Sequence, residues 1–217
     1  PGFRMVQSAM HRLLLNQWLA DQGFIVVSFD GRGTPGRGHD WERAISKHFG
    51  SVPLDDQVAA LKALAGRSDV DLERTGIVGW SFGGYMSALA VLKRPDVFKA
   101  AVAGAPVVDW LDYDTHYTER YLGMPDTDAV AYKEASLLTY AAGLKRPLLL
   151  VHGTADDNVY FRHSLKLADA LFRHGKEFEM LPLSGLTHMV PEPVVMEQLW
   201  SRIAGFFHAQ LGKPELN

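Results

Sequence analysis

A serine flanked by glycines is the residue of this chain that most plainly points to chemistry. Residues 79–84 read Gly-Trp-Ser-Phe-Gly-Gly, so Ser81 lies in the pattern G-x-S-x-G. The apolar pair Ile77-Val78 precedes the pattern, and apolar residues at helical spacing follow it: Tyr85, Met86, Leu89, Ala90 and Leu92. In a strand-turn-helix of this kind, the serine occupies a sharp, strained turn with its Oγ exposed at a helix N-terminus. The motif therefore predicts a nucleophilic Ser81. A glycine-rich turn that serves only the fold is the plainer alternative.

The turn needs small neighbours, because a side chain next to the nucleophile would meet the backbone of the turn. The glycines expected to supply this clearance are Gly79, Gly83 and Gly84.

A serine hydroxyl is a poor nucleophile until an imidazole takes its proton, and the imidazole needs a carboxylate to orient it. In enzymes with this serine motif, the acid and then the histidine follow the serine along the chain, each in a loop after a strand. Here Asp156 follows the apolar run 147–151, and His188 follows the run 178–181. The order predicts a triad of Ser81, Asp156 and His188 that works through an acyl-enzyme.

Each partner of the serine has a competitor. Asp157 could serve in place of Asp156, or could accept backbone N–H groups in the same turn. His152 and His163 lie near the acid loop, but His188 alone occupies the loop after the strand that follows the acid. No grouping of histidine with aspartate or glutamate has the clustering of a zinc site, so we expect neither a metal nor a cofactor.

The first part of the chain must position these residues. A helix is expected over residues 10–19, and a buried strand over residues 24–29 leads into the loop Asp30-Gly31-Arg32-Gly33, where a local salt bridge of Arg32 is favoured. Residues 34–52 suggest an irregular excursion with a short helix over 41–47. The next helix begins near Asp55 and Asp56, which we interpret as helix-cap residues rather than catalysts. It continues through Leu54, Val58, Leu61 and Leu64.

The second part alternates strands and helices, which is typical of an α/β protein with a mostly parallel sheet flanked by helices. The helix after Ser81 should stop at Arg94-Pro95, and strands are expected over 98–103, 147–151 and 178–181. The interval 107–140 is irregular and aromatic. A helix is marked by Leu165, Ala168 and Phe172, and a final helix by Val195, Leu199, Ile203 and Phe206.

Composition bounds the possible functions. The chain has 217 residues, 47% of them hydrophobic, which suits one α/β domain. The net charge is -3, and acidic and basic residues are interspersed, so the sequence has no basic surface typical of nucleic-acid binding. No apolar run is long enough to span a bilayer. Cysteine is absent, which leaves the compartment open, with a periplasmic or secreted location slightly favoured over a cytoplasmic one. The opening Pro1-Gly2-Phe3-Arg4 is neither an initiator nor a signal peptide, so we expect a longer parent polypeptide.

With these residues in place, the chain resembles the catalytic domain of the prolyl oligopeptidase family, and most closely its dipeptidyl peptidase IV branch. The resemblance covers nearly the whole chain and is strongest over residues 28–33, 79–85, 117–121 and 152–159. It implies an α/β-hydrolase fold over residues 1–217. It also implies a serine peptidase that releases N-terminal dipeptides after a penultimate proline or alanine.

The resemblance implies further site residues. The backbone N–H of Phe82 would be one oxyanion donor, and Asn158 would hydrogen-bond a substrate carbonyl. The pocket for the proline side chain would be lined by Phe82, Val107, Trp110, Tyr113, Tyr117 and Val159. A stripe of aromatics is more often packing than pocket, but the position of this one after the strand that follows the elbow favours a pocket.

The chain departs from the family at two places. Phe82 stands where dipeptidyl peptidase IV has tyrosine, and residues 185–189 read Gly-Leu-Thr-His-Met instead of an acidic approach to the histidine. In the family, a tyrosine that precedes this segment supplies a second oxyanion donor. A β-propeller further upstream holds the free amino group of the substrate, and the proteins commonly form homodimers.

Other functions remain open. The same triad also serves acylaminoacyl peptidases and carboxylesterases. From a different class, the chain could be a non-catalytic dimerisation or interaction module that uses the apolar face of its last helix, although that face is more consistent with core.

Overall fold

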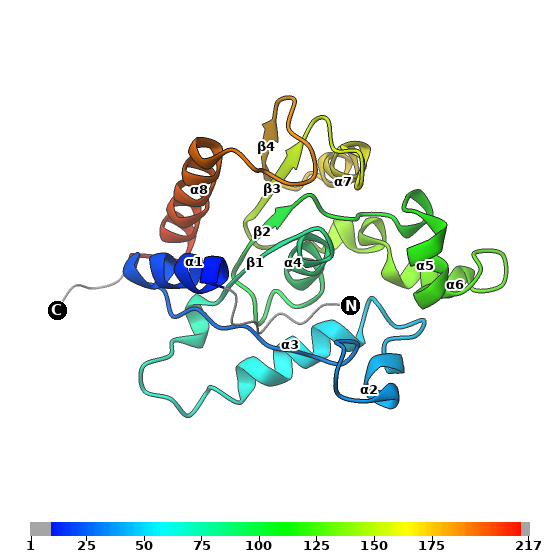
Figure 1. The fold of residues 1–217 in the computed structure, drawn as a ribbon, viewed down its shortest axis with the longest axis horizontal. Coiled ribbons are helices and arrows are strands. Elements are labelled where there is room, and N and C mark those ends of the chain that lie inside the picture. Colours follow the sequence, from blue (N-terminus) through cyan, green and yellow to red (C-terminus); the bar gives the residue numbers. More distant parts are fainter. Residues whose placement is uncertain (1–9, 214–217) are drawn as a thin grey trace.

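The structure is a computed structural model, and it describes residues 10–213. The opening Pro1–Arg4 lie outside the described residues. Four strands form one parallel sheet in the order β1-β2-β3-β4, as Figure 1 shows. These strands are β1 Gly76–Trp80, β2 Ala100–Gly104, β3 Leu148–Gly153 and β4 Glu179–Leu183. The parallel sheet predicted from the sequence is confirmed.

Helices alternate with these strands along the chain. The α-helices are α1 Met10–Asp21, α2 His39–Arg43, α3 Val52–Lys62, α4 Phe82–Lys93, α5 Thr115–Leu122, α6 Ala129–Ala135, α7 Arg162–Arg173 and α8 Pro193–Leu211. Three short 3-10 helices are η1 Leu72–Arg74, η2 Trp110–Asp112 and η3 Leu137–Gly143. The helices expected near both ends of the chain are present as α1 and α8. The helices expected near Asp55 and after Ser81 are present as α3 and α4, and α4 ends just before Arg94, as predicted.

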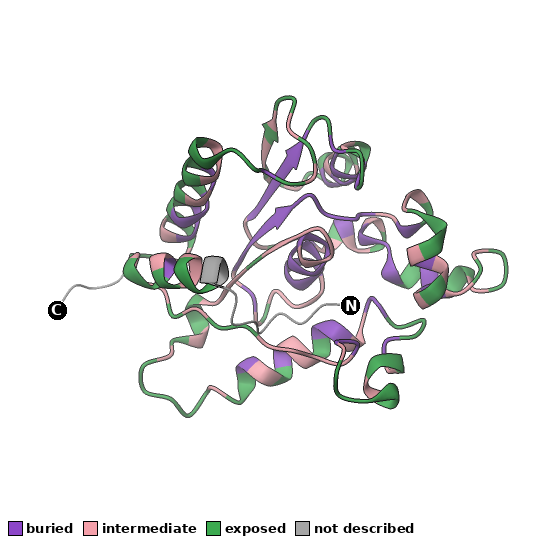
Figure 2. Ribbon diagram, viewed as in Figure 1, coloured by how far each residue is buried: buried purple, intermediate pink, exposed green. Residues whose placement is uncertain are grey.

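The sheet separates two apolar cores. Side chains alternate along β2, so that Ala101 and Ala103 face the core shared with α3, α4 and α7, whereas Ala100 and Val102 face α8. Both β2 and β3 are buried along their whole length (Figure 2). On α8, the predicted apolar face of Leu199, Ile203 and Phe206 is buried in the second core, which confirms its interpretation as core.

The prediction of a buried strand over residues 24–29 is wrong. The segment is extended but joins no strand within the described residues, and its side chains Ile25 and Val27 are 55% and 43% exposed. Its apolar, β-branched sequence suits a strand, but a strand also needs a neighbour in the ladder. In residues 10–213, β1 pairs with β2 and with no other strand.

The helix expected from Leu165, Ala168 and Phe172 is present as α7, and its buried face contains Leu167 and Leu171, whereas Leu165 and Phe172 are exposed. The expectation that the interval 107–140 is irregular is wrong, because this interval contains the two helices α5 and α6.

The loop after the extended segment is fastened to α3. The Arg32 backbone N–H donates to Asp56 Oδ2 at 2.7 Å, and its guanidinium donates to Asp56 Oδ1 at 2.6 Å from Nη2 and 3.0 Å from Nε. The predicted salt bridge of Arg32 is confirmed. Asp55 lies in the first turn of α3. Asp56 is not a cap, because its carboxylate forms the ion pair with Arg32.

Candidate active site

Ser81 occupies the sharp turn that its motif predicts. It lies between the end of β1 and the start of α4 with φ 60° and ψ −117°, a left-handed backbone that is strained for a residue with a side chain. Its N–H donates to Gly104 O at 2.8 Å, which fastens the turn to the neighbouring strand. The Phe82 N–H, at the start of α4, makes no hydrogen bond within the described residues and can point to a ligand.

Close backbone packing explains most of the glycines at this turn. A Cβ on Gly79 would lie 2.5 Å from the Gly83 carbonyl, and a Cβ on Gly84 would lie 2.2 Å from Gly104 O. A Cβ on Gly83 would meet nothing within 4 Å. The prediction that residue 83 must be glycine to avoid a clash of its own side chain is therefore wrong. Gly104 was not predicted, and a Cβ there would lie 1.9 Å from the ring of Trp80.

Asp156 lies in the loop after β3, and its carboxylate has three hydrogen-bond partners, one of them an imidazole. Its side chain is fully buried. The backbone N–H groups of Asn158 and Val159 donate to Oδ1 at 3.0 and 2.9 Å, and His188 Nδ1 lies 2.8 Å from Oδ2. Asp157 is exposed, and it forms no hydrogen bond or ion pair with His188 in the part of the chain that the structure describes.

His188 lies in the loop between β4 and α8, and its side chain is 13% exposed. The His188 carbonyl accepts a hydrogen bond of 2.7 Å from Trp80 Nε1. Trp80 directly precedes Ser81, so this bond ties the histidine loop to the turn. Ser81 Oγ makes no hydrogen bond within residues 10–213.

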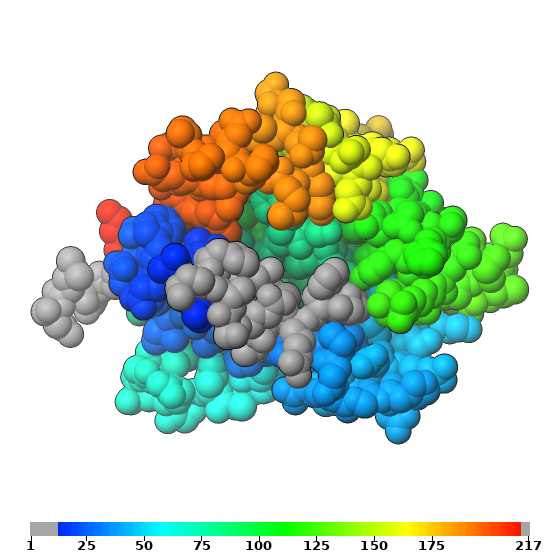
Figure 3. Space-filling view, in the orientation of Figure 1, coloured from blue at the N-terminus to red at the C-terminus, as the bar shows by residue number. Residues whose placement is uncertain are grey.

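The three side chains thus follow three strands of one parallel sheet. Ser81 follows β1, Asp156 follows β3 and His188 follows β4, and the carboxyl ends of parallel strands meet at one edge. Figure 3 shows the surface hollowed over this edge, between the orange β4–α8 connection and the green segment that carries η2 and α5.

Aromatic rings form a continuous wall beside the turn. The Trp110 ring lies 6.1 Å from that of Phe82, 5.8 Å from that of Tyr113 and 6.1 Å from that of Tyr117, the last pair being stacked. Phe82, Tyr113 and Tyr117 are half-buried, so a ligand would meet these three rings first. The remaining predicted members are buried behind them: Val107, Trp110 and Val159.

Phe49 belongs to the same wall and was not predicted. It is fully buried, with its ring 4.9 Å from that of Trp110 and 5.4 Å from that of Phe82. Because it comes from the irregular segment before α3, no spacing or motif in the sequence connects it to the other rings.

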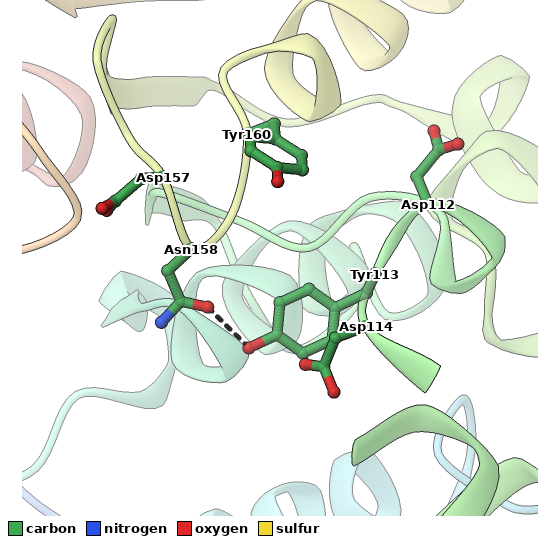
Figure 4. A pocket seen from close by; sticks show the side chains of 6 residues that line it. All are labelled: Asp112, Tyr113, Asp114, Asp157, Asn158 and Tyr160. Carbon is green, nitrogen blue, oxygen red and sulfur yellow. Dashed lines mark hydrogen bonds between the residues drawn. The ribbon is translucent and has the colours of Figure 1, made fainter. Parts of the chain in front are cut away.

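An open hollow of about 520 Å³ adjoins this wall (Figure 4). Its lining residues are Asp112, Tyr113, Asp114, Asp157, Asn158 and Tyr160. The Tyr113 hydroxyl donates to Asn158 Oδ1 at 2.8 Å, and Figure 4 shows the Asn158 amide nitrogen on the side away from Tyr113. Two of the predicted substrate-binding residues therefore line the hollow and are bonded to each other.

A cluster of charges joins this region to α7. Asp112 in η2 forms ion pairs with both Arg162 and Lys166, and Lys166 Nζ also lies 3.3 Å from Asp109. Burial alone would raise the pKa of Asp112, but the hydrogen bond and charge of Lys166, with the charge of Arg162, outweigh it and hold the pKa below its usual range. Burial and the charges of Asp114 and Asp156 raise the pKa of the Tyr113 hydroxyl.

No group of three or more His, Cys, Asp or Glu within residues 10–213 is arranged to hold a metal ion. No helix in this range has the length and apolar character that crossing a bilayer requires.

Comparisons with known proteins show the family of the chain. Residues 12–214 match the prolyl oligopeptidase family. Human dipeptidyl peptidase 8 is 40% identical over 198 residues, which are 89% of this chain and 22% of that protein. Bovine dipeptidyl peptidase 4 is 34% identical over 202 residues, 91% of this chain and 26% of that protein. The chain thus spans about a quarter of the length of these relatives.

A solved structure is similar as well. The crystal structure of Porphyromonas gingivalis dipeptidyl peptidase 4 superposes with a TM-score of 0.80 at 37% identity, covering 84% of this chain and 26% of that one. This likeness confirms the α/β-hydrolase fold expected from the sequence.

Proposed function

Because the chain belongs to the prolyl oligopeptidase family, we propose that it is a serine peptidase domain that releases N-terminal dipeptides after a penultimate proline or alanine. The observation that carries the proposal is the 2.8 Å contact of His188 Nδ1 with the buried Asp156, on a loop tied by Trp80 to the turn of Ser81. The names of the relatives support the dipeptide specificity.

In the proposed reaction, Ser81 Oγ attacks the scissile carbonyl while His188 Nε2 takes the hydroxyl proton. Asp156 keeps the proton of His188 on Nδ1 and stabilises the imidazolium. The free N–H of Phe82 donates to the oxyanion, and His188 returns its proton to the leaving amine. Water, activated in turn by His188, then hydrolyses the acyl-enzyme and restores Ser81.

The aromatic wall supports the choice of proline. A pyrrolidine ring is rigid and apolar, so it loses little conformational entropy when buried against rings such as those of Phe82, Tyr113 and Tyr117. Because Asn158 Oδ1 is occupied by the Tyr113 hydroxyl, the Asn158 amide N–H groups remain available to a substrate carbonyl. Contacts of the substrate with these rings and with the Asn158 amide would hold it on the side of Ser81 where the Phe82 N–H lies.

The proposal has two further requirements that rest on the family resemblance. The family resemblance implies a second oxyanion donor and a propeller that holds the free amino group, and it implies a homodimer. One oxyanion donor contributes about 2.7–4 kcal/mol of transition-state stabilisation. We therefore expect this segment, prepared alone, to cleave proline dipeptide substrates poorly compared with the full-length protein.

The test uses the full-length protein and its Ser81→Ala variant. Each is treated with an active-site fluorophosphonate and assayed for release of Gly-Pro and Ala-Pro from chromogenic substrates. We expect labelling and dipeptide release in the wild type and neither in the variant.

Other outcomes would select the alternatives. Labelling with hydrolysis of N-acylated amino-acid substrates or short acyl esters, but without dipeptide release, would identify an acylaminoacyl peptidase or a carboxylesterase and refute the dipeptide specificity. A dimer that is never labelled would indicate a non-catalytic module and refute the triad.

A further inference from the structure

A second imidazole contacts the carboxylate of Asp156. His152, near the end of β3, is fully buried, and its Nε2 lies 2.7 Å from Val159 O and 3.2 Å from Asp156 Oδ2. Its other nitrogen, Nδ1, lies 2.7 Å from the hydroxyl of Ser164 in α7, which is also fully buried. Neither residue takes part in the mechanism described above.

The partners of His152 define its protonation. Val159 O and the Asp156 carboxylate can only accept hydrogen bonds, so Nε2 must carry a proton. The Ser164 hydroxyl can donate its hydrogen to Nδ1, so Nδ1 needs no proton of its own and the imidazole stays neutral. Burial lowers the pKa of His152, although Asp156 opposes this effect. The ring is therefore a neutral donor in a fixed orientation.

This donor completes the surroundings of the acid. Asp156 Oδ1 accepts from two backbone N–H groups, and Oδ2 accepts from His188. His152 Nε2 lies 3.2 Å from Oδ2 on the other side, so its single N–H, which is bonded to Val159 O at 2.7 Å, is shared with the carboxylate. The carboxylate cannot rotate towards or away from His188 without breaking one of these bonds.

We infer that His152, oriented by Ser164, is a positioning residue that fixes the Asp156 carboxylate for its bond to His188. The inference rests on the proposed function, because it assigns His152 a part in the same reaction. It predicts that the loss of the His152 donor slows the attack of Ser81 without weakening substrate binding.

The test compares two substitutions in the full-length protein. His152→Gln keeps a side-chain N–H group that can reach Asp156, whereas His152→Phe keeps a ring but has no donor. The rate of Ser81 labelling by a fluorophosphonate is measured across pH, and kcat and KM are measured separately with the dipeptide substrate that the wild type cleaves. Besides Asp156, the titratable groups whose charge acts on His152 or responds to it are His188 and His163.

We expect His152→Phe to lower kcat and the labelling rate by about tenfold to a hundredfold, the worth of one hydrogen bond to a charged group, with KM nearly unchanged. The midpoint of its pH profile should move away from that of the wild type, and His152→Gln should recover part of both effects. Ser164→Ala should lie between His152→Gln and the wild type. Ser87→Ala is its matched control, because Ser87 is a fully buried helix serine whose hydroxyl is bound within its own helix to Gly83 O.

Three results would overturn the inference while the wild type is still labelled. These are an unchanged pH profile and kcat in His152→Phe, an equal loss in His152→Phe and His152→Gln, or a loss that follows the unfolding temperature of the variants instead of their donor. A wild type that is never labelled at Ser81 would instead refute the proposed function, so the two failures are distinguishable.

Discussion

The indole nitrogen of Trp80 donates a hydrogen bond of 2.7 Å to the carbonyl oxygen of His188, which lies 108 residues further along the chain. This bond joins the residue before the proposed nucleophile, Ser81, to the backbone of the proposed base, His188. We expect Trp80→Phe to slow fluorophosphonate labelling of Ser81 by roughly threefold to tenfold, because a neutral hydrogen bond is lost and the histidine loop is held less firmly. Hydrogen exchange of residues 184–192 should increase in the same variant.

Trp200→Phe is the control for this prediction. Trp200 packs against the same apolar core as Trp80, but its Nε1 is buried without a hydrogen-bond partner in the described part of the chain. Its substitution should leave the labelling rate unchanged. Equal rates in Trp80→Phe and Trp200→Phe would contradict a role for the bond to His188.

A methyl group on Gly84 should disrupt the turn. It would be placed 2.2 Å from Gly104 O, so the first turn of α4 and β2 must move apart. We expect Gly84→Ala to lower the free energy of unfolding by about 3 kcal/mol or more, measured by denaturant titration. Gly205→Ala in α8 meets nothing within 4 Å and should raise it by up to about 1 kcal/mol, since alanine favours a helix. Similar losses in both variants would refute the steric explanation.

His163 should make stability depend on pH. It is fully buried, and burial lowers its pKa to about 4 from an ordinary 6.5. Between these values the unfolded chain binds a proton that the folded chain does not, so stability is complete above about pH 6.5 and is lost as pH falls towards 4, by about 3 kcal/mol in total. His152, whose pKa is also lowered, adds to the same slope.

The variant His163→Asn tests this origin. Its side-chain oxygen can still accept the hydrogen bond that His163 Nδ1 takes from Val108 N, but it does not titrate. Denaturant unfolding between pH 7 and 4 should show a shallower loss of stability than in the wild type. An identical slope in both proteins would show that other groups cause the pH dependence.

Tyr113→Phe should affect binding more than chemistry. The substitution removes the hydroxyl that occupies Asn158 Oδ1, so the amide loses the orientation that presents its N–H groups. We expect KM for the dipeptide substrate to rise about threefold to tenfold with a smaller change in kcat. The double variant with Asn158→Ala checks the reason, because Tyr113→Phe should add little once Asn158 is absent. Additive effects would mean that the hydroxyl acts on substrate directly.

The parts of the site that depend on chain order could be predicted from the sequence. Ser81 has a local motif, and Asp156 and His188 each follow a recognisable strand. The contacts of Trp80, Phe49 and His152 could not be predicted, because each joins segments whose distance in space no spacing reveals.

The same limit explains the errors in the fold. The segment 24–29 has the composition of a strand but no ladder partner within the described residues, and pairing is not visible in one segment alone. On α7 the sequence predicted the helix but not its buried face, because Leu165 and Leu167 both belong to sets with helical spacing. Asp56 was interpreted as a helix cap, but its carboxylate binds Arg32, which is distant in the sequence.

We expect the ion pairs of Asp112 to make the aromatic wall sensitive to ionic strength. Arg162 and Lys166 are 58% and 39% exposed, so mobile counterions can compete for both cations, while the aspartate between them stays shielded from solvent. Added salt should therefore loosen η2 from α7 before it disturbs either core. The width of the hollow at Tyr113 would then vary with the electrolyte around the protein, although every residue that lines it stays the same.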